Sequence, residues 1–404
     1  MTVRNETTLP PFGLTGWAAA DIADPYPVYR RYREAAPMHR APDGTHYVFG
    51  YDAVTAVLAS RDFGRRAHPA EGEPRPLVPN RFAALRTMVE NWLVFMDPPR
   101  HIALRSVLGR EFSPSVVSDL RGRITEIGAA LLADIPDATE FDFVRAFAAP
   151  LPILVIGELL GVPAERWDWL RERAVAIQGA SSSRVGGRAD TLVAADAAAH
   201  DLRDYFLSVA AQRRTAPRAD LISLLLRCEG LTDDEFAATC VHLMTAGHET
   251  TTNALGKAVL TLAARPEAAA RLRAMPRLHA SAVDELIRFD GPVQAVTRWA
   301  QHDLLLAEER IPQGAKLIAM LGAANRDPAR FPDPDAFLLS RPTAGHVGFG
   351  RGIHYCLGAT LARTELEIGL GLLLPILDRF TVAAVEYPHD MVFHGPELLR
   401  LRRA

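Results

Sequence analysis

The spacing of hydrophobic residues along this chain predicts helix over most of its length. In these segments apolar side chains recur every three or four residues, or the composition itself favours helix. The pattern is interrupted where Pro, Gly or clustered polar residues occur. The segments predicted to be helical are 26–36, 120–135, 164–178, 191–214, 232–264, 266–274, 278–289 and 359–374.

Segments with the pattern of strands are few and short. They are 46–49, the segments 296–300 and 304–307, which we expect to pair with each other, and the extended end of the chain from 380 to 401. We therefore expect a mainly α fold with a small β region. No repeat, low-complexity tract or linker divides the sequence, so residues 1–404 are expected to form one domain.

The helix predicted over 232–264 is unusually long. Thr232 and Glu235 form a capping box, in which each side chain hydrogen-bonds to the other residue's backbone. Pro266 ends the pattern. At about 1.5 Å per residue this helix is about 48 Å long. A helix of that length has to cross most of the molecule.

Two stretches have the composition of loops. The stretch 65–79 is rich in Pro, Gly and charged residues, and 178–188 is rich in Gly and Ser. Taken alone, both are expected to be solvated connections between helices.

The composition excludes several classes of protein. With a net charge of only −3, the chain is not expected to bind nucleic acid through bulk positive charge. No apolar run reaches the roughly 18 to 20 residues of a membrane span, and the polar N-terminus is not a signal peptide or an anchor. Three cysteines form no disulfide framework, so we expect a soluble protein of the cytoplasm.

One cysteine, Cys356, lies on a glycine-rich loop directly before a predicted helix. Gly350 and Gly352 allow the loop to turn sharply. The helix N-terminus supplies free N–H groups and partial positive charge, and both are expected to favour a thiolate. Residue types alone leave four possibilities: a buried inert cysteine, a nucleophile, a zinc ligand with His346 and His354, or an iron ligand facing a planar cofactor.

The whole segment resembles the haem-binding loop of the cytochrome P450 family. That loop follows the pattern FGxGxHxCxGxxLARxE, and 349–365 matches it at every fixed position. The resemblance extends from Asp24 to the C-terminus. It implies the cytochrome P450 fold, with the long central helix crossing a haem b whose iron is bound by Cys356. Phe349, Gly350, Leu357 and Gly358 are then expected around the sulfur.

The middle of the long helix resembles the family's [AG]Gx[DE]T motif, here Ala246 to Thr250. The resemblance implies that Ala246 and Gly247 lie beside the haem and that Glu249 and Thr250 relay protons during oxygen activation. A local reading is also open, in which the Thr250 hydroxyl bonds back to the Ala246 carbonyl and bends the helix. His248 is expected to be a packed or partly exposed histidine rather than an iron ligand.

Two further motifs resemble those of the family. His101 and Arg105 match DxPxHxxLR, and with Arg298 and His354 they are expected to neutralise the haem propionates. Alone, each of them suits an ordinary surface charge equally well. The ExxR motif predicts a charge network that braces the cysteine loop, although Leu338 stands where the family usually has aspartate. Its three members are Glu285, Arg288 and Arg341.

The resemblance also implies a substrate pocket of mostly apolar residues, suited to an apolar or amphipathic small molecule. The two loop stretches, 65–79 and 178–188, correspond to family segments that cover the substrate entrance, which indicates a lid. The expected pocket residues are Trp92, Leu93, Val94, Leu243, Val293, Ala295, Val296 and Phe393.

The implied activity is that of a monooxygenase of natural-product metabolism or catabolism, acting as a monomer with O2. The chain ends soon after the haem segment, so electrons from NAD(P)H are expected through an external ferredoxin and its reductase. A basic docking face could be formed by Arg100, Arg110, Arg351 and Arg363. An atypical haem-thiolate oxidase (coupling, epoxidation, desaturation, nitration or peroxygenation) and a catalytically silent haem-binding protein are the alternatives.

Overall fold

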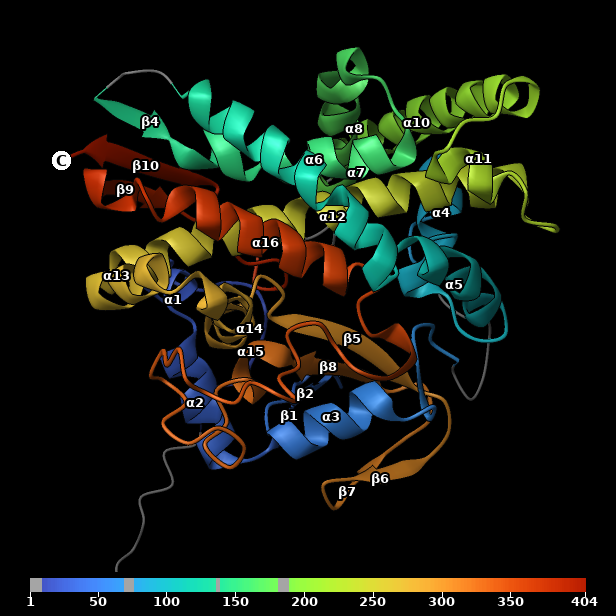
Figure 1. Cartoon of the computed structure of the whole chain (residues 1–404). Coiled ribbons are helices and arrows are strands. Elements are labelled where there is room, and N and C mark those ends of the chain that lie inside the picture. The colour runs from blue at the N-terminus through green and yellow to red at the C-terminus, as the bar shows by residue number, and fades with distance from the viewer. Residues whose placement is uncertain (1–8, 69–75, 136–138, 181–188) are drawn as a thin grey trace, which may run out of the picture.

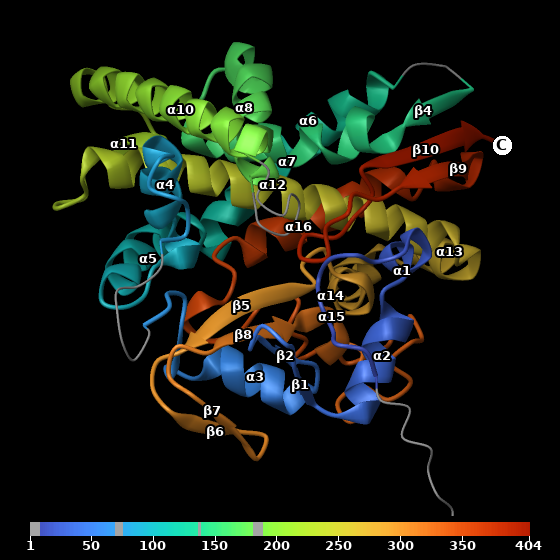
Figure 2. The same cartoon turned by 180° about the vertical axis from the view of Figure 1, so that it is seen from behind.

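The computed structural model describes residues 9–68, 76–135, 139–180 and 189–404. Helices make up one large layer, and a five-stranded sheet with short helices lies against it (Figures 1 and 2). The helices are α1 (Ala19–Ala23), α2 (Tyr26–Ala35), α3 (Tyr51–Ala59), α4 (Ala83–Glu90), η1 (Leu93–Phe95), α5 (Arg100–Glu111), α6 (Pro114–Ala133), η2 (Val144–Ala148), α7 (Pro150–Leu160), η3 (Ala164–Arg166), α8 (Trp167–Gly179), α10 (Ala189–Thr215), α11 (Leu221–Leu225), α12 (Asp233–Ala263), α13 (Pro266–Ala274), η4 (Pro276–Leu278), α14 (His279–Asp290), α15 (Leu321–Ala324), η5 (Gly352–His354), α16 (Ala359–Leu373) and η6 (Leu377–Arg379).

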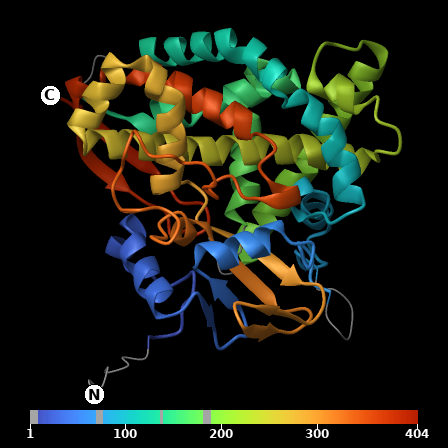
Figure 3. The same cartoon turned by 60° about the horizontal axis from the view of Figure 1, so that its bottom comes forward.

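The central helix α12 organises the helical layer. It runs across the molecule (Figure 3), and its 31 residues correspond to about 46 Å. Both predicted hydrogen bonds of the capping box are present, from Glu235 N to Thr232 Oγ1 at 3.2 Å and from Thr232 N to Glu235 Oε2 at 2.7 Å. Most α12 side chains are buried, so its stability comes mainly from packing.

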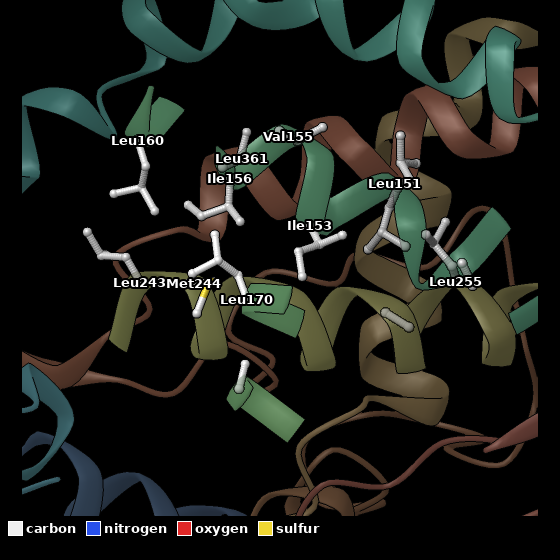
Figure 4. Close-up of a cluster of buried hydrophobic side chains, with 14 of the residues drawn as sticks. Leu151, Ile153, Val155, Ile156, Leu160, Leu170, Leu243, Met244, Leu255 and Leu361 are labelled. Carbon is white, nitrogen blue, oxygen red and sulfur yellow. The ribbon is translucent and has the colours of Figure 1, made fainter. Parts of the chain in front are cut away.

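The largest hydrophobic core surrounds α12. Side chains of α7 face those of α12 and α16, as Figure 4 shows for Ile153 and Ile156 of α7, Met244 and Leu255 of α12, and Leu361 of α16. α10 and α14 also pack against α12. The helix is therefore held on several sides, and its position is fixed relative to the residues that follow Cys356.

The main sheet has the strand order β1–β2–β8–β5–β3. Only β2 and β8 pair in parallel, with Tyr47 opposite Ile318. This sheet and α3 lie below α12 and α16 in Figure 1. Its strands are β1 (Met38–Arg40), β2 (His46–Val48), β3 (Phe63–Gly64), β5 (Ala295–Ala300) and β8 (Lys316–Met320).

The predicted pairing of 296–300 with 304–307 is wrong. β5 pairs with β8 and β3, whereas β6 (Leu304–Leu306) forms a two-stranded hairpin with β7 (Glu309–Ile311). Its two turn residues, Ala307 and Glu308, both have positive φ, as a tight hairpin turn requires. Neither is the Gly or Asn that usually marks such a turn, so the sequence gives no signal there.

A three-stranded sheet of order β4–β10–β9 joins the C-terminus to the middle of the chain. Its strands are β4 (Glu140–Asp142), β9 (Phe380–Glu386) and β10 (Leu398–Arg403). The extended C-terminus is thus confirmed, although its two strands are separated by a long connection. Of the two possible lid stretches, 65–79 and 178–188, residues 69–75 and 181–188 lie outside the described residues.

Candidate active site

Cys356 lies at the end of a loop that is bent by two glycines. Gly350 and Gly352 have φ values of +71° and +69°, which side-chain-bearing residues rarely adopt. A Cβ on Gly352 would also come within 2.5 Å of the Leu58 carbonyl oxygen. The loop is closed by a 2.9 Å hydrogen bond from Cys356 N to the Phe349 carbonyl. The sequence therefore holds the sulfur at a fixed place before α16.

Burial raises the pKa of the Cys356 thiol, contrary to the expectation that the helix N-terminus alone would favour the thiolate. A hydrogen bond from the Gly358 N–H and the charges of Arg105 and Arg363 lower this pKa, but burial outweighs them. A stable thiolate therefore needs a stronger positive charge at the sulfur. A bound metal ion supplies such a charge.

The outer side of the cysteine loop is covered by an aromatic ring and a charged side chain. The Arg363 guanidinium lies 4.3 Å from the centre of the Phe349 ring and forms a 2.7 Å ion pair with Asp284. Arg363 also donates to the Tyr355 hydroxyl at 3.1 Å. These contacts fix the ring of Phe349 beside the loop.

A cluster of basic side chains also lies close to the loop. Arg298 of β5 is buried, and Arg105 of α5 donates a 2.6 Å hydrogen bond to the Tyr355 carbonyl. The rings of His101 and His354 lie 4.2 Å apart. The structure thus brings together the four residues that sequence analysis had proposed for the propionates, from three separate segments of the chain, α5, β5 and η5.

Arg65 is a fifth basic member of this cluster, which sequence analysis did not identify. It directly follows β3 and is buried, donating to the carbonyls of Val94, at 2.6 Å, and Thr297. Burial and the neighbouring charge of Arg298 lower its pKa to about 9. The sequence offered only an arginine at the start of a Pro- and Gly-rich stretch, with no periodic signal.

Within the described residues, acidic side chains offset only part of the positive charge of the basic cluster. Burial, and then the charges of Arg298 and Arg65, lower the pKa of His354 to about 2. Burial lowers the pKa of Arg298 to about 10, with Asp97 acting in the opposite direction. Both ring nitrogens of His101 and Nε2 of His354 are buried without a hydrogen-bond partner. Such a cluster is suited to a ligand with more than one negative charge, and the two propionates of haem fit it.

The middle of α12 differs from the rest of the helix in being accessible. Ala246 is exposed, and Gly247, Glu249 and Thr250 are partly exposed, although most of α12 is buried. The Thr250 hydroxyl donates to the Ala246 carbonyl at 3.0 Å, and the helix continues without a break. A Cβ on Gly247 would meet only Ile156, at an ordinary 3.7 Å. Protein packing therefore gives no reason for glycine at this position.

His248 is turned away from this accessible face. It is buried, and burial together with the charge of Arg171 lowers its pKa to about 4. The imidazole is therefore neutral at pH 7 and packed within the helical layer.

The predicted ExxR network is present and fully buried. The Glu285 carboxylate accepts hydrogen bonds from Arg288 at 2.6 and 2.8 Å and from Arg341 at 3.1 Å. The backbone N–H of Leu338 donates to the same carboxylate at 2.9 Å, so the unusual leucine leaves that main-chain contact intact. Arg288 also donates to the carbonyls of Asn325, Pro334 and Ala336.

This network reaches the cysteine loop through Asn325. The Asn325 side-chain oxygen accepts a 2.7 Å hydrogen bond from the backbone N–H of Val347, two residues before Phe349. The chain from Asn325 to Val347 is therefore held at both ends. The role of these three buried charges is therefore to position the loop and not to contact a ligand.

A zinc site has no support among the described residues, where no three His, Cys, Asp or Glu side chains are grouped to hold a metal. His346 is instead engaged locally. Its Nε2 lies 3.3 Å from an Asp284 oxygen, and its Nδ1 accepts from the Gly348 N–H at 3.2 Å.

The residues predicted to form a substrate pocket lie on four separate segments. Val293 and Phe393 are paired in an isolated β-bridge. Val296 is partly exposed, whereas Ala295 lies on the opposite face of β5, packed within the N-terminal core cluster. The main core contains Leu93 and Leu243, which are buried, and Trp92 packs against it, while Val94 is partly exposed.

Comparison with known proteins identifies the family of this chain. The family model described as Cytochrome P450 matches residues 191–400. The cytochrome P450 monooxygenase PikC of Streptomyces venezuelae is 36% identical, covering 99% of this chain and 96% of PikC. Vitamin D(3) 25-hydroxylase of Pseudonocardia autotrophica is 34% identical, covering 93% of this chain and 92% of the hydroxylase.

The fold agrees with solved structures. P450BioI in complex with an acyl carrier protein ligated to hexadec-9Z-enoic acid superimposes with a TM-score of 0.89 at 31% identity, covering 96% of this chain and 99% of P450BioI. Among the described residues, no helix is both long and apolar enough to cross a membrane. The chain belongs to the cytochrome P450 family of haem monooxygenases, which use O2.

Proposed function

We propose that this protein hydroxylates an apolar or amphipathic small organic molecule, with Cys356 as the thiolate ligand of the haem iron. The observation that carries this proposal is the placement of Cys356 at the end of a rigid glycine loop, next to a buried basic cluster whose charge is only partly compensated. When bound, the haem would supply the activation of O2 and the insertion of one oxygen atom into the substrate. Everything else in the site would position the haem, the substrate and protons.

The basic cluster is proposed to hold the two propionates. Arg298, Arg105 and Arg65 would donate charge-assisted hydrogen bonds, and one ring N–H each of His101 and His354 would gain an acceptor. In addition, the Gly358 N–H would hydrogen-bond to the thiolate and the ring of Phe349 would shield it. The basic cluster would thus offset the charge of the propionates, and the Gly358 N–H would offset that of the thiolate.

Replacing Arg298 with glutamate is expected to weaken haem retention strongly. The substitution places a buried negative charge where a propionate is proposed to lie, so repulsion replaces attraction. The fraction of haem retained after gel filtration, read from the ratio of Soret to protein absorbance, should fall well below that of the unaltered protein. The matched control is Arg310→Glu, since Arg310 is 82% exposed on β7. Full haem loading in Arg298→Glu would remove Arg298 from the cluster's function.

Thr250 and Glu249 are proposed to deliver protons on the accessible face of α12. The Thr250 hydroxyl already donates to the Ala246 carbonyl, so its oxygen can accept a hydrogen bond and pass on a proton. Glu249 is adjacent in sequence and partly exposed, as a group that exchanges protons with solvent must be. This proposal assigns the hydroxyl a chemical role in addition to its local hydrogen bond.

Thr250→Ala is expected to lower the yield of hydroxylated product per NADH consumed by about 10²-fold, within the range for loss of one acid–base group. Thr250→Ser keeps the hydroxyl and should recover most of the yield. NADH consumption and product are measured together, with a surrogate ferredoxin and reductase. If the hydroxyl serves only the helix, both variants will keep normal coupling and differ only slightly in thermal stability.

The substrate is proposed to be a mainly apolar molecule, either free or attached to a carrier protein. The residues expected around the pocket are mostly hydrophobic. Among related proteins, one is named as a vitamin D(3) hydroxylase and another is solved with a fatty acid ligated to an acyl carrier protein. Low-spin to high-spin shifts of the ferric haem, recorded with free and carrier-linked compounds, would separate these two forms of substrate.

Other oxidations are possible on the same scaffold. One relative is named as an epoxidase and one solved structure is described as forming a C–S bond. Hydroxylation is preferred here because the acid and alcohol of the α12 motif are both present. Mass spectrometry separates coupling, which adds no oxygen atom, from hydroxylation and epoxidation, which each add one. The NMR spectrum of the product then distinguishes a hydroxyl group from an epoxide.

Electrons are proposed to come from NAD(P)H through a ferredoxin and its reductase. Of the four arginines expected on the docking face, Arg100 is paired with Glu235 and Arg363 with Asp284. Arg110 and Arg351 are exposed, and neither has an ion-pair partner within 4.0 Å among the described residues. Arg351 lines a surface hollow beside Phe349 and Tyr355. It is therefore the better candidate for docking an acidic partner.

A further inference from the structure

A second polar feature lies beside α12, formed by Trp92 and His242. The indole of Trp92 stacks on the imidazole of His242, with ring centres 5.1 Å apart and planes inclined by 25°. Trp92 Nε1 and His242 Nδ1 are both buried and neither has a hydrogen-bond partner. Two polar atoms that are hidden from water without partners, on two rings in contact, are unfavourable unless a ligand satisfies them.

The stack is held rigidly by its neighbours. Trp92 stacks on Phe95 with an interplanar angle of 10°, and the Arg65 guanidinium lies 5.3 Å from the centre of the Phe95 ring. Arg65 also donates to the Val94 carbonyl at 2.6 Å. The loop that carries Trp92 is thus fastened to α12 and to the basic cluster, so the indole N–H has a defined direction.

His242 is on the same side of α12 as the accessible residues. Ala246 and Thr250 follow it at intervals of four residues, which places them on one face at about 6 and about 12 Å along the helix. Burial, and then the charge of Arg65, lower the pKa of His242 to about 4. The ring is therefore neutral at pH 7, with one nitrogen that donates and one that accepts.

We propose that Trp92 and His242 bind a neutral oxygen atom of the substrate, either a hydroxyl or a carbonyl. The indole N–H can only donate, so the substrate atom has to accept. A hydroxyl can also donate to the imidazole, and a carbonyl can accept from its N–H form. A carboxylate fits less well, because the imidazole stays neutral at pH 7 and offers no positive charge to pair with the anion.

This inference rests on the proposed function and refines its substrate class. The polar atoms lie about two helical turns from Thr250. The substrate is therefore anchored by its oxygen at one end and oxidised at an apolar carbon towards the other end. Trp92 was expected in the pocket as an apolar surface, whereas His242 was not singled out from the sequence.

The test uses the haem-loaded protein and a matched pair of ligands, 1-decanol and undecane, which differ by a hydroxyl in place of a methyl group. Dissociation constants are obtained from the spin-state shift of the ferric haem. The unaltered protein should bind 1-decanol with a dissociation constant about tenfold or more lower than that of undecane. This ratio corresponds to the free energy of one or two hydrogen bonds. Trp92→Phe and His242→Phe keep the aromatic volume and should each reduce this preference to about threefold or less.

Trp17→Phe is the control, because its indole already donates to the Gly13 carbonyl at 2.8 Å in the N-terminal segment. It should leave the preference unchanged. Decanoate serves as the anionic comparison and should bind more weakly than 1-decanol at pH 7. Equal affinity for alcohol and alkane in the unaltered protein, or an unchanged preference in both pocket variants, would overturn the proposal.

If neither chain compound binds, the ligands found in a general screen take their place. The proposal requires that they contain a hydroxyl or carbonyl oxygen and bind Trp92→Phe about tenfold more weakly. Ligands that lack such an oxygen, or that bind both proteins equally, contradict it. The carbon monoxide spectrum of each variant separates this outcome from failure of the proposed haem ligation, since a normal spectrum leaves only the polar pair in question.

Discussion

Cys356→His is expected to abolish hydroxylation even if the variant still binds haem. Histidine can hold haem iron, but a neutral imidazole lacks the electron donation of a thiolate, which favours cleavage of the O–O bond. The glycine loop and the basic cluster do not depend on the sulfur, so haem loading should fall less than activity. Product formation with a surrogate ferredoxin system should be undetectable.

The control for this variant is Cys240→Ser, because Cys240 is buried in α12 with no proposed role in ligation. It should keep the normal haem spectrum, although burying a hydroxyl costs some stability. Substrate oxidation by Cys356→His at a rate close to that of the unaltered protein would contradict the assignment of the thiolate.

Glu285→Gln is expected to have the largest effect on folding. The carboxylate is 1% exposed and compensates two buried guanidinium groups, Arg288 and Arg341. Neutralising it leaves both cations buried without an anion, at a cost of about 3–5 kcal/mol. Since a folded protein is stable by only about 5–15 kcal/mol, this loss is a large part of the total. Soluble, haem-loaded protein should be scarce at 37 °C.

The matched control is Glu367→Gln, which makes the same chemical change in an ion pair with Arg121 near the surface. Exposed pairs contribute about 0–1 kcal/mol, so this variant should be nearly normal. Denaturant titrations of both variants, followed by tryptophan fluorescence, give the comparison. Similar midpoints for Glu285→Gln and the unaltered protein would show that the network does not hold the loop.

Several helices were predictable from the sequence because their determinants are local, whereas α3, α4, α5 and α7 were not predicted. The capping box at Thr232 and the proline at 266 define the limits of α12, and the structure places it at Asp233–Ala263. The C-terminal helix, predicted as 359–374, is observed as Ala359–Leu373. Periodicity and capping act over a few residues, so they can be read without knowledge of the fold.

Features that depend on distant partners were less predictable. β5 pairs with β8 across a separation that contains the β6–β7 hairpin, and nothing in the segment 296–307 indicates this. Lys257 is another example. It is buried in α12 and forms a 2.7 Å ion pair with Asp290 of α14, although the sequence shows only a lysine within an apolar helix.

The candidate site was predicted in part. The motifs singled out Cys356, Arg298 and the other expected ligands of the propionates, and the structure brings them together. The electrostatics of the sulfur were misjudged, since burial outweighs the helix N-terminus and raises the pKa of Cys356. Arg65 and His242 were missed because their roles follow from tertiary contacts rather than from spacing. Burial and charge balance are properties of the folded chain.

Ligation of the haem iron by the Cys356 thiolate is the claim on which the other proposals depend. It is tested most directly by the absorption spectrum of the purified, reduced protein in the presence of carbon monoxide. If Cys356 binds the iron as a thiolate, the Soret band will lie at the long wavelength that is diagnostic of thiolate ligation. A Soret band at the shorter wavelength found with a neutral ligand, under conditions in which the protein is folded and loaded with haem, would contradict this ligation.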